Sequence, residues 1–261
     1  MVKRRNRHNI YNRYGLCAFL IIVGMTVKGC IGFWSPREIV PEGDFVSFTV
    51  PAEGAAETLK ITSTDPIITV DWGNGIIKEY TSPMNEFMYV APNKTVKIYS
   101  PSSITKLQVT DAYSFNNLYL CVNIEEFHAL FVRMSTLVLP AEWVNIKTIE
   151  IEGYPSESGS TPIIIDTHAE WTQIQTMIIY DDGNSVVRLF AYHEWTSMTY
   201  LVMVGGALDE QSVTKILVSL DSAGTESGVL DLSGGTSATP GPQGLTAATN
   251  LRNKGWSVYT N

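Results

Sequence analysis

Apolar residues recur at fixed distances from three Glu-Trp pairs in the middle of the chain, Glu142-Trp143, Glu170-Trp171 and Glu194-Trp195. Counted from each tryptophan, they occupy the third, sixth and eighth following positions. The three sets are Ile146, Ile149 and Ile151; Ile174, Met177 and Ile179; and Met198, Leu201 and Met203. The tryptophans are 28 and 24 residues apart. An internal period in the twenties is typical of solenoids, in which each unit buries its apolar face against its neighbours.

The last two apolar positions of each unit are two residues apart, which is the spacing of side chains on one face of a strand. The pattern therefore predicts short strands stacked in parallel, with one apolar face and one face open to solvent. Weaker copies of the spacing start at Pro101 and Cys121, and Leu230 and Trp256 mark further candidate units. The alternative interpretation is that these segments are unrelated strands of an ordinary sandwich.

Short β-type runs precede the repeats between residues 45 and 102. They are rich in β-branched and aromatic residues and are separated by turn residues at short intervals, which is typical of an antiparallel module. Gly73-Asn74-Gly75 lies between two of these runs. It predicts a hairpin, because glycine and asparagine accept the positive φ that tight turns need. We expect a β-sandwich-like module at residues 45–102.

The C-terminal part alternates strand and helix patterns. Asp209 is a suitable N-cap for a helix in which Val213, Ile216, Leu217 and Leu220 share one face, with Gly224 beyond its end. A strand at residues 229–232, a second helix at residues 245–254 and a strand after Gly255 complete a β-α-β-α-β order. This order predicts parallel strands with crossover helices, which form an α/β cap on the repeats.

Charge is unevenly distributed along the 261 residues. Six basic residues and no acidic residue precede Cys30, so the remaining chain has 12 basic and 26 acidic residues. An acidic body repels phosphate backbones, and we therefore expect no nucleic-acid partner. The hydrophobic content of 44% against 17% charged residues excludes a disordered chain.

The basic N-terminus leads into an apolar run at residues 16–27, which has the length of a signal-peptide core and is short for a spanning helix. The run ends in Val27-Lys28-Gly29-Cys30, which is similar to a bacterial lipobox and predicts lipidation of Cys30. Lys28 departs from the usual small residue at its position, so a retained signal anchor is the alternative. In both cases residues 1–30 attach the chain to a membrane, residues 31–44 are a linker, and the rest lies outside the cytoplasm.

Two further cysteines are present: Cys17 lies within the apolar run, and Cys121 occupies a tryptophan position of the repeat. With Cys30 lipidated, we expect Cys121 to be a lone buried thiol that packs as a small hydrophobe. A disulfide between Cys30 and Cys121 remains the alternative if Cys30 is neither lipidated nor embedded. The spacing of the cysteines does not fit a metal site, and we expect no cofactor.

The sequence Asp71-Trp72-Gly73-Asn74-Gly75 resembles the Asp-Trp-Gly-Asp-Gly signature of a small β-sandwich module in surface proteins of Bacteroidetes-type bacteria and their phages. Asn74 departs from the more common Asp. In that family leucine-rich-repeat units follow the module, much as Ser103-Ile104-Thr105-Lys106-Leu107 does here. Residues 213–258 also resemble the ends of such proteins, notably phage-encoded ones. The resemblance implies a mainly β chain with an α/β C-terminal part, in which residues 103–261 form an irregular leucine-rich-repeat-like solenoid.

Residues with catalytic or metal-binding chemistry have structural interpretations in this pattern. His168 and His193 precede Glu-Trp pairs at similar repeat positions, which favours a repeated structural role over acid–base catalysis. Asp181-Asp182-Gly183-Asn184 is similar to part of a calcium loop, but it lacks the later glutamate and lies where a turn is needed. Trp143 and its two equivalents either pack between units or form an exposed ladder for glycan stacking, and packing is favoured.

The solvent-facing side of the predicted sheet is the expected contact surface. Its candidate residues intervene between the apolar positions: Lys147, Glu150, Gln175, Ile178, Thr199 and Val202. We expect a non-enzymatic surface protein that binds a protein or a glycan and that can form a homo-oligomer. A membrane-seated structural virion protein is the first alternative. An extracellular glycan hydrolase is the second, and it requires two carboxylates about 5–10 Å apart in a cleft.

Overall fold

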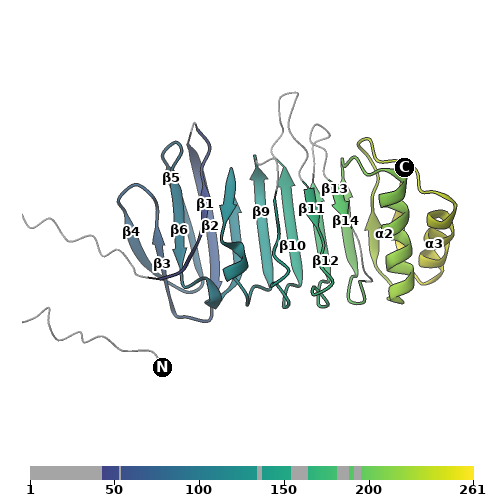
Figure 1. Cartoon of the computed structure of the whole chain (residues 1–261), viewed down its shortest axis with the longest axis horizontal. Coiled ribbons are helices and arrows are strands. Elements are labelled where there is room, and N and C mark those ends of the chain that lie inside the picture. The colour runs from purple at the N-terminus through teal and green to yellow at the C-terminus, as the bar shows by residue number, and fades with distance from the viewer. Residues whose placement is uncertain (1–42, 53, 134–136, 154–163, 181–187, 191–194) are drawn as a thin grey trace, which may run out of the picture. The chain divides into compact units, whose positions relative to one another are not determined.

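The computed structural model of the chain describes residues 43–52, 54–133, 137–153, 164–180, 188–190 and 195–261. Residues Ile39–Asn261 form one compact unit. Its described part is mainly β, with mixed sheets and two α-helices (Figure 1). The coarse fold class expected from the sequence, a mainly β chain with an α/β C-terminal part, is therefore confirmed.

The larger sheet has nine strands in the order β16-β15-β14-β12-β10-β9-β7-β2-β5. In chain order these are β2 (Ala55–Ser63), β5 (Met84–Val90), β7 (Ile104–Thr110), β9 (Glu126–Val132), β10 (Thr148–Gly153), β12 (Thr176–Tyr180), β14 (Tyr200–Val204), β15 (Val229–Asp231) and β16 (Ser257–Tyr259). Neighbouring strands from β7 to β16 pair in parallel, whereas β2 pairs antiparallel with both β7 and β5.

The smaller sheet has five antiparallel strands in the order β4-β3-β6-β1-β8. They are β1 (Phe45–Thr49), β3 (Ile67–Asp71), β4 (Ile77–Thr81), β6 (Thr95–Tyr99) and β8 (Ser114–Asn116). The hairpin predicted at Gly73-Asn74-Gly75 joins β3 to β4, and both glycines have positive φ. A third, two-stranded sheet pairs β11 (Ile164–Asp166) with β13 (Arg188–Phe190).

The predicted apolar positions occupy equivalent places in neighbouring strands. Ile149, Met177 and Leu201 lie side by side on β10, β12 and β14, as do Ile151, Ile179 and Met203. All six side chains are fully buried. The first of these rows continues to Phe127 and Leu107 on one side and to Leu230 and Val258 on the other. The strand register deduced from the spacing is therefore confirmed.

The tryptophans of the repeat pack inside the molecule. Trp143, Trp171 and Trp195 are at most 1% exposed. The indole N–H groups of Trp143 and Trp171 donate to Leu118 O and Pro140 O, each at 3.0 Å. Leu118 precedes the Cys121 unit and Pro140 precedes the Trp143 unit, so each indole bonds to the chain segment that leads into the preceding unit. The tryptophans therefore join successive segments. The packing interpretation is confirmed, and an exposed glycan-stacking ladder is excluded.

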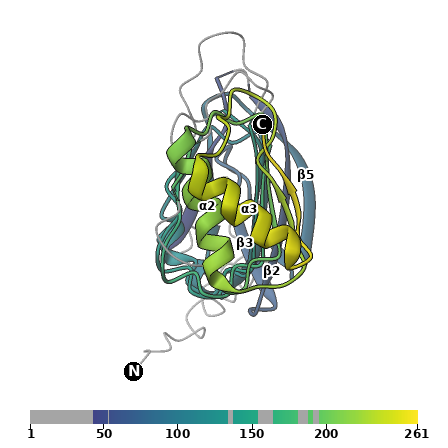
Figure 2. The ribbon, with the colours of Figure 1, turned by 90° about the vertical axis from the view of Figure 1, so that its right-hand side faces the viewer.

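The two helices are α2 (Glu210–Ala223) and α3 (Pro242–Asn253), at the C-terminal end of the larger sheet (Figures 1 and 2). The Asp209 side chain accepts the N–H of Ser212, and Gly224 ends α2 in the left-handed conformation. The four predicted core residues of α2 are all buried. Helix α3 starts at Pro242, earlier than expected, because proline fits the first helical turn. The order β14-α2-β15-α3-β16 has parallel strands, as predicted.

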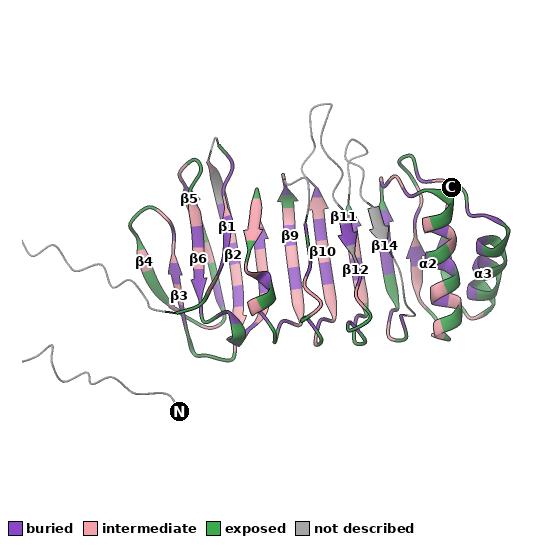
Figure 3. Ribbon diagram, in the orientation of Figure 1, coloured by how far each residue is buried: buried purple, intermediate pink, exposed green. Residues whose placement is uncertain are grey.

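One hydrophobic core extends from Val46 on β1 to Val258 on β16. Figure 3 shows buried residues alternating with less buried ones along the strands. The core includes residues from both sides of the module boundary expected at residue 102. Strand β2, which precedes this boundary in the chain, pairs directly with β7, which follows it. The two sheets around the first part of the core are compatible with the β-sandwich-like module expected there.

Candidate contact surface

The face of the larger sheet that points away from the core is the candidate site. Strand registers align one outward residue from every strand into a row that we call the central row: Asn85, Lys60, Gln108, His128, Glu150, Ile178, Val202, Asp231 and Tyr259. The first half of this row is polar or charged, and the second half contains Ile178, Val202 and Tyr259 with one acidic residue, Asp231, among them. The face therefore has two chemically different halves.

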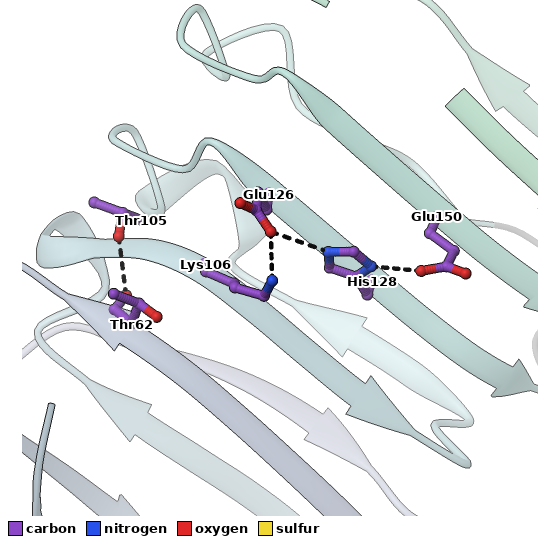
Figure 4. Close-up of polar contacts among 6 residues, drawn as sticks. All are labelled: Thr62, Thr105, Lys106, Glu126, His128 and Glu150. Atoms are coloured by element: carbon purple, nitrogen blue, oxygen red, sulfur yellow. Dashed lines mark hydrogen bonds and ion pairs between the residues drawn. The ribbon is translucent and has the colours of Figure 1, made fainter. Parts of the chain in front are cut away.

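The polar half contains a hydrogen-bonded group that we call the polar cluster: Lys106, Glu126, His128 and Glu150 (Figure 4). Nδ1 of His128 lies 2.6 Å from Glu150 Oε2, and its Nε2 lies 3.4 Å from Glu126 Oε2. The Lys106 ammonium donates to Glu126 Oε2. These contacts join β7, β9 and β10 across the outer face.

Two carboxyl groups in this region have shifted pKa values. The hydrogen bond from Lys106, partly offset by burial, lowers the pKa of Glu126. Burial, followed by the nearby charge of Glu150, raises the pKa of Glu152. His128 is the least exposed of the polar cluster, with 13% of its side chain accessible, whereas Glu126 has 43%. The cluster therefore presents carboxylate oxygens and an ammonium group to solvent around a histidine held in a fixed orientation.

The other half contains a set of side chains that we call the apolar patch, all of them exposed except the half-buried Ile178: Ile178, Tyr180, Tyr200, Val204 and Tyr259. Tyr259 is 54% exposed, and Tyr180 is 41% exposed. Tyrosine combines a large apolar ring with a hydroxyl group, a combination that is enriched at protein interfaces. The patch lies next to the polar cluster, because Glu150 and Ile178 are neighbours in the central row.

Three of the predicted contact residues lie just before the strands. Lys147, Gln175 and Thr199 form a ladder of backbone hydrogen bonds, in which Gln175 N–H donates to Lys147 O at 2.9 Å and Thr199 N–H donates to Gln175 O at 3.0 Å. The Lys147 ammonium also forms an ion pair with Glu125 at 2.7 Å. Gln175 and Thr199 are exposed, and Lys147 is half-buried. Their backbones stabilise the strand stacking, and their side chains lie at the rim of the outer face.

The other three predicted residues belong to the central row, where Glu150, Ile178 and Val202 are successive neighbours. Glu150 and Ile178 are half-buried. The expectation that Val202 is exposed is wrong, because only 6% of it is accessible. It lies between the outward side chains of β12 and β15 and between Tyr200 and Val204 of its own strand, so its neighbours enclose it.

Sequence reasoning missed the polar cluster apart from Glu150, and it missed every tyrosine of the apolar patch. His128 could have been found, because it is the seventh residue after Cys121, as Glu150 is the seventh after Trp143. Cys121 itself is fully buried, and burial raises the pKa of its thiol to about 12. It therefore packs as the expected hydrophobe, and its proximity in sequence to His128 provides no thiolate chemistry.

The remaining candidate residues have structural contacts or lie outside the described ranges. His168 donates through Nε2 to Leu139 O at 2.8 Å and packs edge-on against Trp171, which agrees with a structural role. His193, residues 181–184 and Cys30 lie outside the described residues. Within the described ranges, no helix is both long and apolar enough to cross a bilayer. The same part of the chain contains no group of three His, Cys, Asp or Glu side chains arranged to hold a metal ion.

Comparisons with protein-family models, curated proteins and solved structures find no match to this chain.

Proposed function

We propose that this chain is a non-enzymatic binding or adhesion protein, held at a membrane by residues 1–30 and exposed outside the cytoplasm. The outer face of the larger sheet is the contact surface, and its ligand is a protein or a glycan. The observation that carries the proposal is the adjacency of the apolar patch and the polar cluster on one face. Interfaces commonly combine aromatic side chains at their centre with polar groups around them.

We also infer that residues 103–261 form a leucine-rich-repeat-like solenoid with an α/β cap. Two features support this inference. The parallel strands share one register, and the backbone ladder through Glu125, Lys147, Gln175 and Thr199 repeats the same hydrogen bond from unit to unit. In a solenoid each unit contacts mainly its neighbours, so its outer face becomes longer with each added unit. A long, flat face of this kind suits a macromolecular ligand.

The full chain should bind host-surface preparations or a component of a glycan array. Replacing Tyr180 and Tyr200 by serine should weaken that binding at least about tenfold, because each change removes an exposed ring that a ligand would bury. Tyr119→Ser is the matched control, since Tyr119 is 51% exposed but lies outside the larger sheet. Thermal unfolding checks that all variants remain folded.

Binding that survives both changes on the outer face would contradict the proposed surface. If residues 45–102 by themselves account for that binding, the remaining residues 103–261 are a spacer and not the contact surface. A structural virion component is the second candidate function, favoured by the edge strand β5 of the larger sheet, on which Phe87 and Tyr89 are exposed. Assembly of the full chain into particles, without binding to any surface or glycan, would support it instead.

A further inference from the structure

The edges of the two large sheets are protected to different degrees. The edge strands are β4 and β8 in the smaller sheet and β5 and β16 in the larger one. Strands β8 and β16 have only three residues each, and β4 exposes the charged residues Lys78 and Glu79. Short length and exposed charge are two common ways in which proteins prevent edge strands from pairing with other chains.

Strand β5 has neither form of protection. It is seven residues long, and its outward side chains Asn85, Phe87 and Tyr89 are all uncharged. Phe87 is 69% exposed and Tyr89 is 61% exposed. On the opposite face, Met88 packs against the hydrophobic core, so the strand is fixed in place by its own molecule. The one charged residue of β5, Glu86, is half-buried on the inward face, opposite Leu59 of β2. A long, ordered edge whose outward side chains carry no charge favours pairing with another strand.

The backbone orientation of β5 leaves hydrogen-bonding groups directed away from β2. On β2, Thr58 N–H donates to the Thr110 hydroxyl on β7 at 2.8 Å. Because N–H groups alternate along a strand, Glu57 and Leu59 direct theirs toward β5, where they are opposite Met88 and Glu86. The backbone groups of Asn85 and Phe87 therefore point to the open edge.

We propose that β5 pairs antiparallel with β5 of a second copy of this chain, with the two-fold axis at Phe87. This register uses all seven residues of the strand. It places Phe87 opposite Phe87, Asn85 opposite Tyr89, and Glu86 opposite Met88. Aromatic residues that face each other across an antiparallel pair stabilise it, and no like charges are opposed.

Neighbouring registers fit less well. Moving the axis to Glu86 places two glutamates directly opposite each other, which destabilises a strand pair. Moving it to Met88 pairs only the five residues from Glu86 to Val90. Met84 and Asn85 then extend beyond Val90 of the second copy and have no strand residue opposite them. The Phe87 register therefore combines the longest overlap with no opposed charges.

The pairing has a consequence for the contact surface. Antiparallel strands that oppose side chains on the same face are related by a two-fold axis perpendicular to the sheet. The outer faces of the two copies consequently point to the same side and form one continuous sheet. A ligand array on an opposing surface would meet two polar clusters and two apolar patches at once, which increases avidity.

The experiment measures the mass of the detergent-solubilised full chain by sedimentation equilibrium over a wide concentration range. The wild-type chain should form a dimer. Phe87→Lys and Phe87→Glu should each raise the dimer dissociation constant at least about tenfold, because each opposes two like charges across the axis. An equimolar mixture of these two variants should recover the dimer, because lysine then faces glutamate.

Leu245→Lys provides the matched control, since Leu245 is 52% exposed on α3, and it should leave the dimer unchanged. Circular dichroism confirms that each variant is folded. A wild-type chain that is monomeric throughout would overturn the proposal, as would a dimer that persists in both Phe87 variants. Failure of the mixture to recover the dimer would rule out the Phe87 register. If Phe87→Lys loses glycan binding while the mass of the assembly in sedimentation stays the same, the edge strand binds a glycan instead.

Discussion

Glu57 is a buried carboxyl group in the core between the two sheets, and its replacement by glutamine should alter the pH dependence of stability. Glu57 lies on β2 on the same side as Leu59 and is fully buried. Its Oε2 accepts the Thr110 hydroxyl at 3.5 Å, and Oε1 has no hydrogen-bond partner among the described residues. Burial, together with the charge of Asp111, raises the pKa of Glu57 to about 8.

The sign of the effect follows from proton binding in the two states. In the unfolded chain this carboxyl titrates near 4.5, so between pH 4.5 and 8 the unfolded state loses a proton that the folded state retains. The free energy of unfolding therefore falls as the pH rises through this window. With 1.36 kcal/mol per pKa unit, the loss is roughly 3 kcal/mol between pH 4.5 and 7 and approaches about 5 kcal/mol above pH 8.

Urea unfolding of the full chain at a series of pH values from 5 to 8.5 measures this contribution. Glutamine has nearly the same shape as glutamate and stays neutral, so Glu57→Gln should remove most of the decline and be the more stable protein at pH 8. Glu79→Gln is the control for losing one carboxylate, because Glu79 is exposed on β4. Parallel loss of stability in the wild-type chain and Glu57→Gln, or a less stable Glu57→Gln at pH 8, would show that Glu57 does not cause the decline.

Two further predictions concern the repeat and the leader. Trp143→Phe should lower the free energy of unfolding by about 1–3 kcal/mol, because Leu118 O loses the donor that lies 3.0 Å away in a buried position; unchanged urea unfolding would contradict this. Intact-mass measurement should find a lipid adduct on Cys30 that is absent from Cys30→Ala, whereas retention of residues 1–29 in the mature chain would support a signal anchor.

Local periodicity in the sequence was enough to predict most elements of the fold. The two-residue spacing of Ile149 and Ile151 marks a strand with one buried face, and the structure places both residues inward on β10. The helical spacing from Val213 to Leu220, with Asp209 as N-cap, predicted α2 in the same way. These predictions succeed because the side-chain direction along one element depends only on the backbone geometry of that element.

The composition of the outer face could be predicted only in part. The positions of Glu150 and Ile178 in one row follow from the repeat register, and the structure places them side by side. The same register does not reveal that Val202 is buried, because its exposure depends on the sizes of four neighbouring side chains. It also does not show that His128 has carboxylates from β9 and β10 on its two ring nitrogens.

The sequence therefore specifies which residues of β10, β12 and β14 face inward and where α2 begins and ends. The structure was needed to show that β2 and β5 extend the parallel sheet through antiparallel pairing, and that β5 becomes its open edge. The structure also places Glu57 in the core, although a glutamate in a strand of alternating polarity is normally expected to face solvent. This difference arises because strand pairing joins residues far apart in the chain, and their spacing along the sequence carries no information about which strands become neighbours.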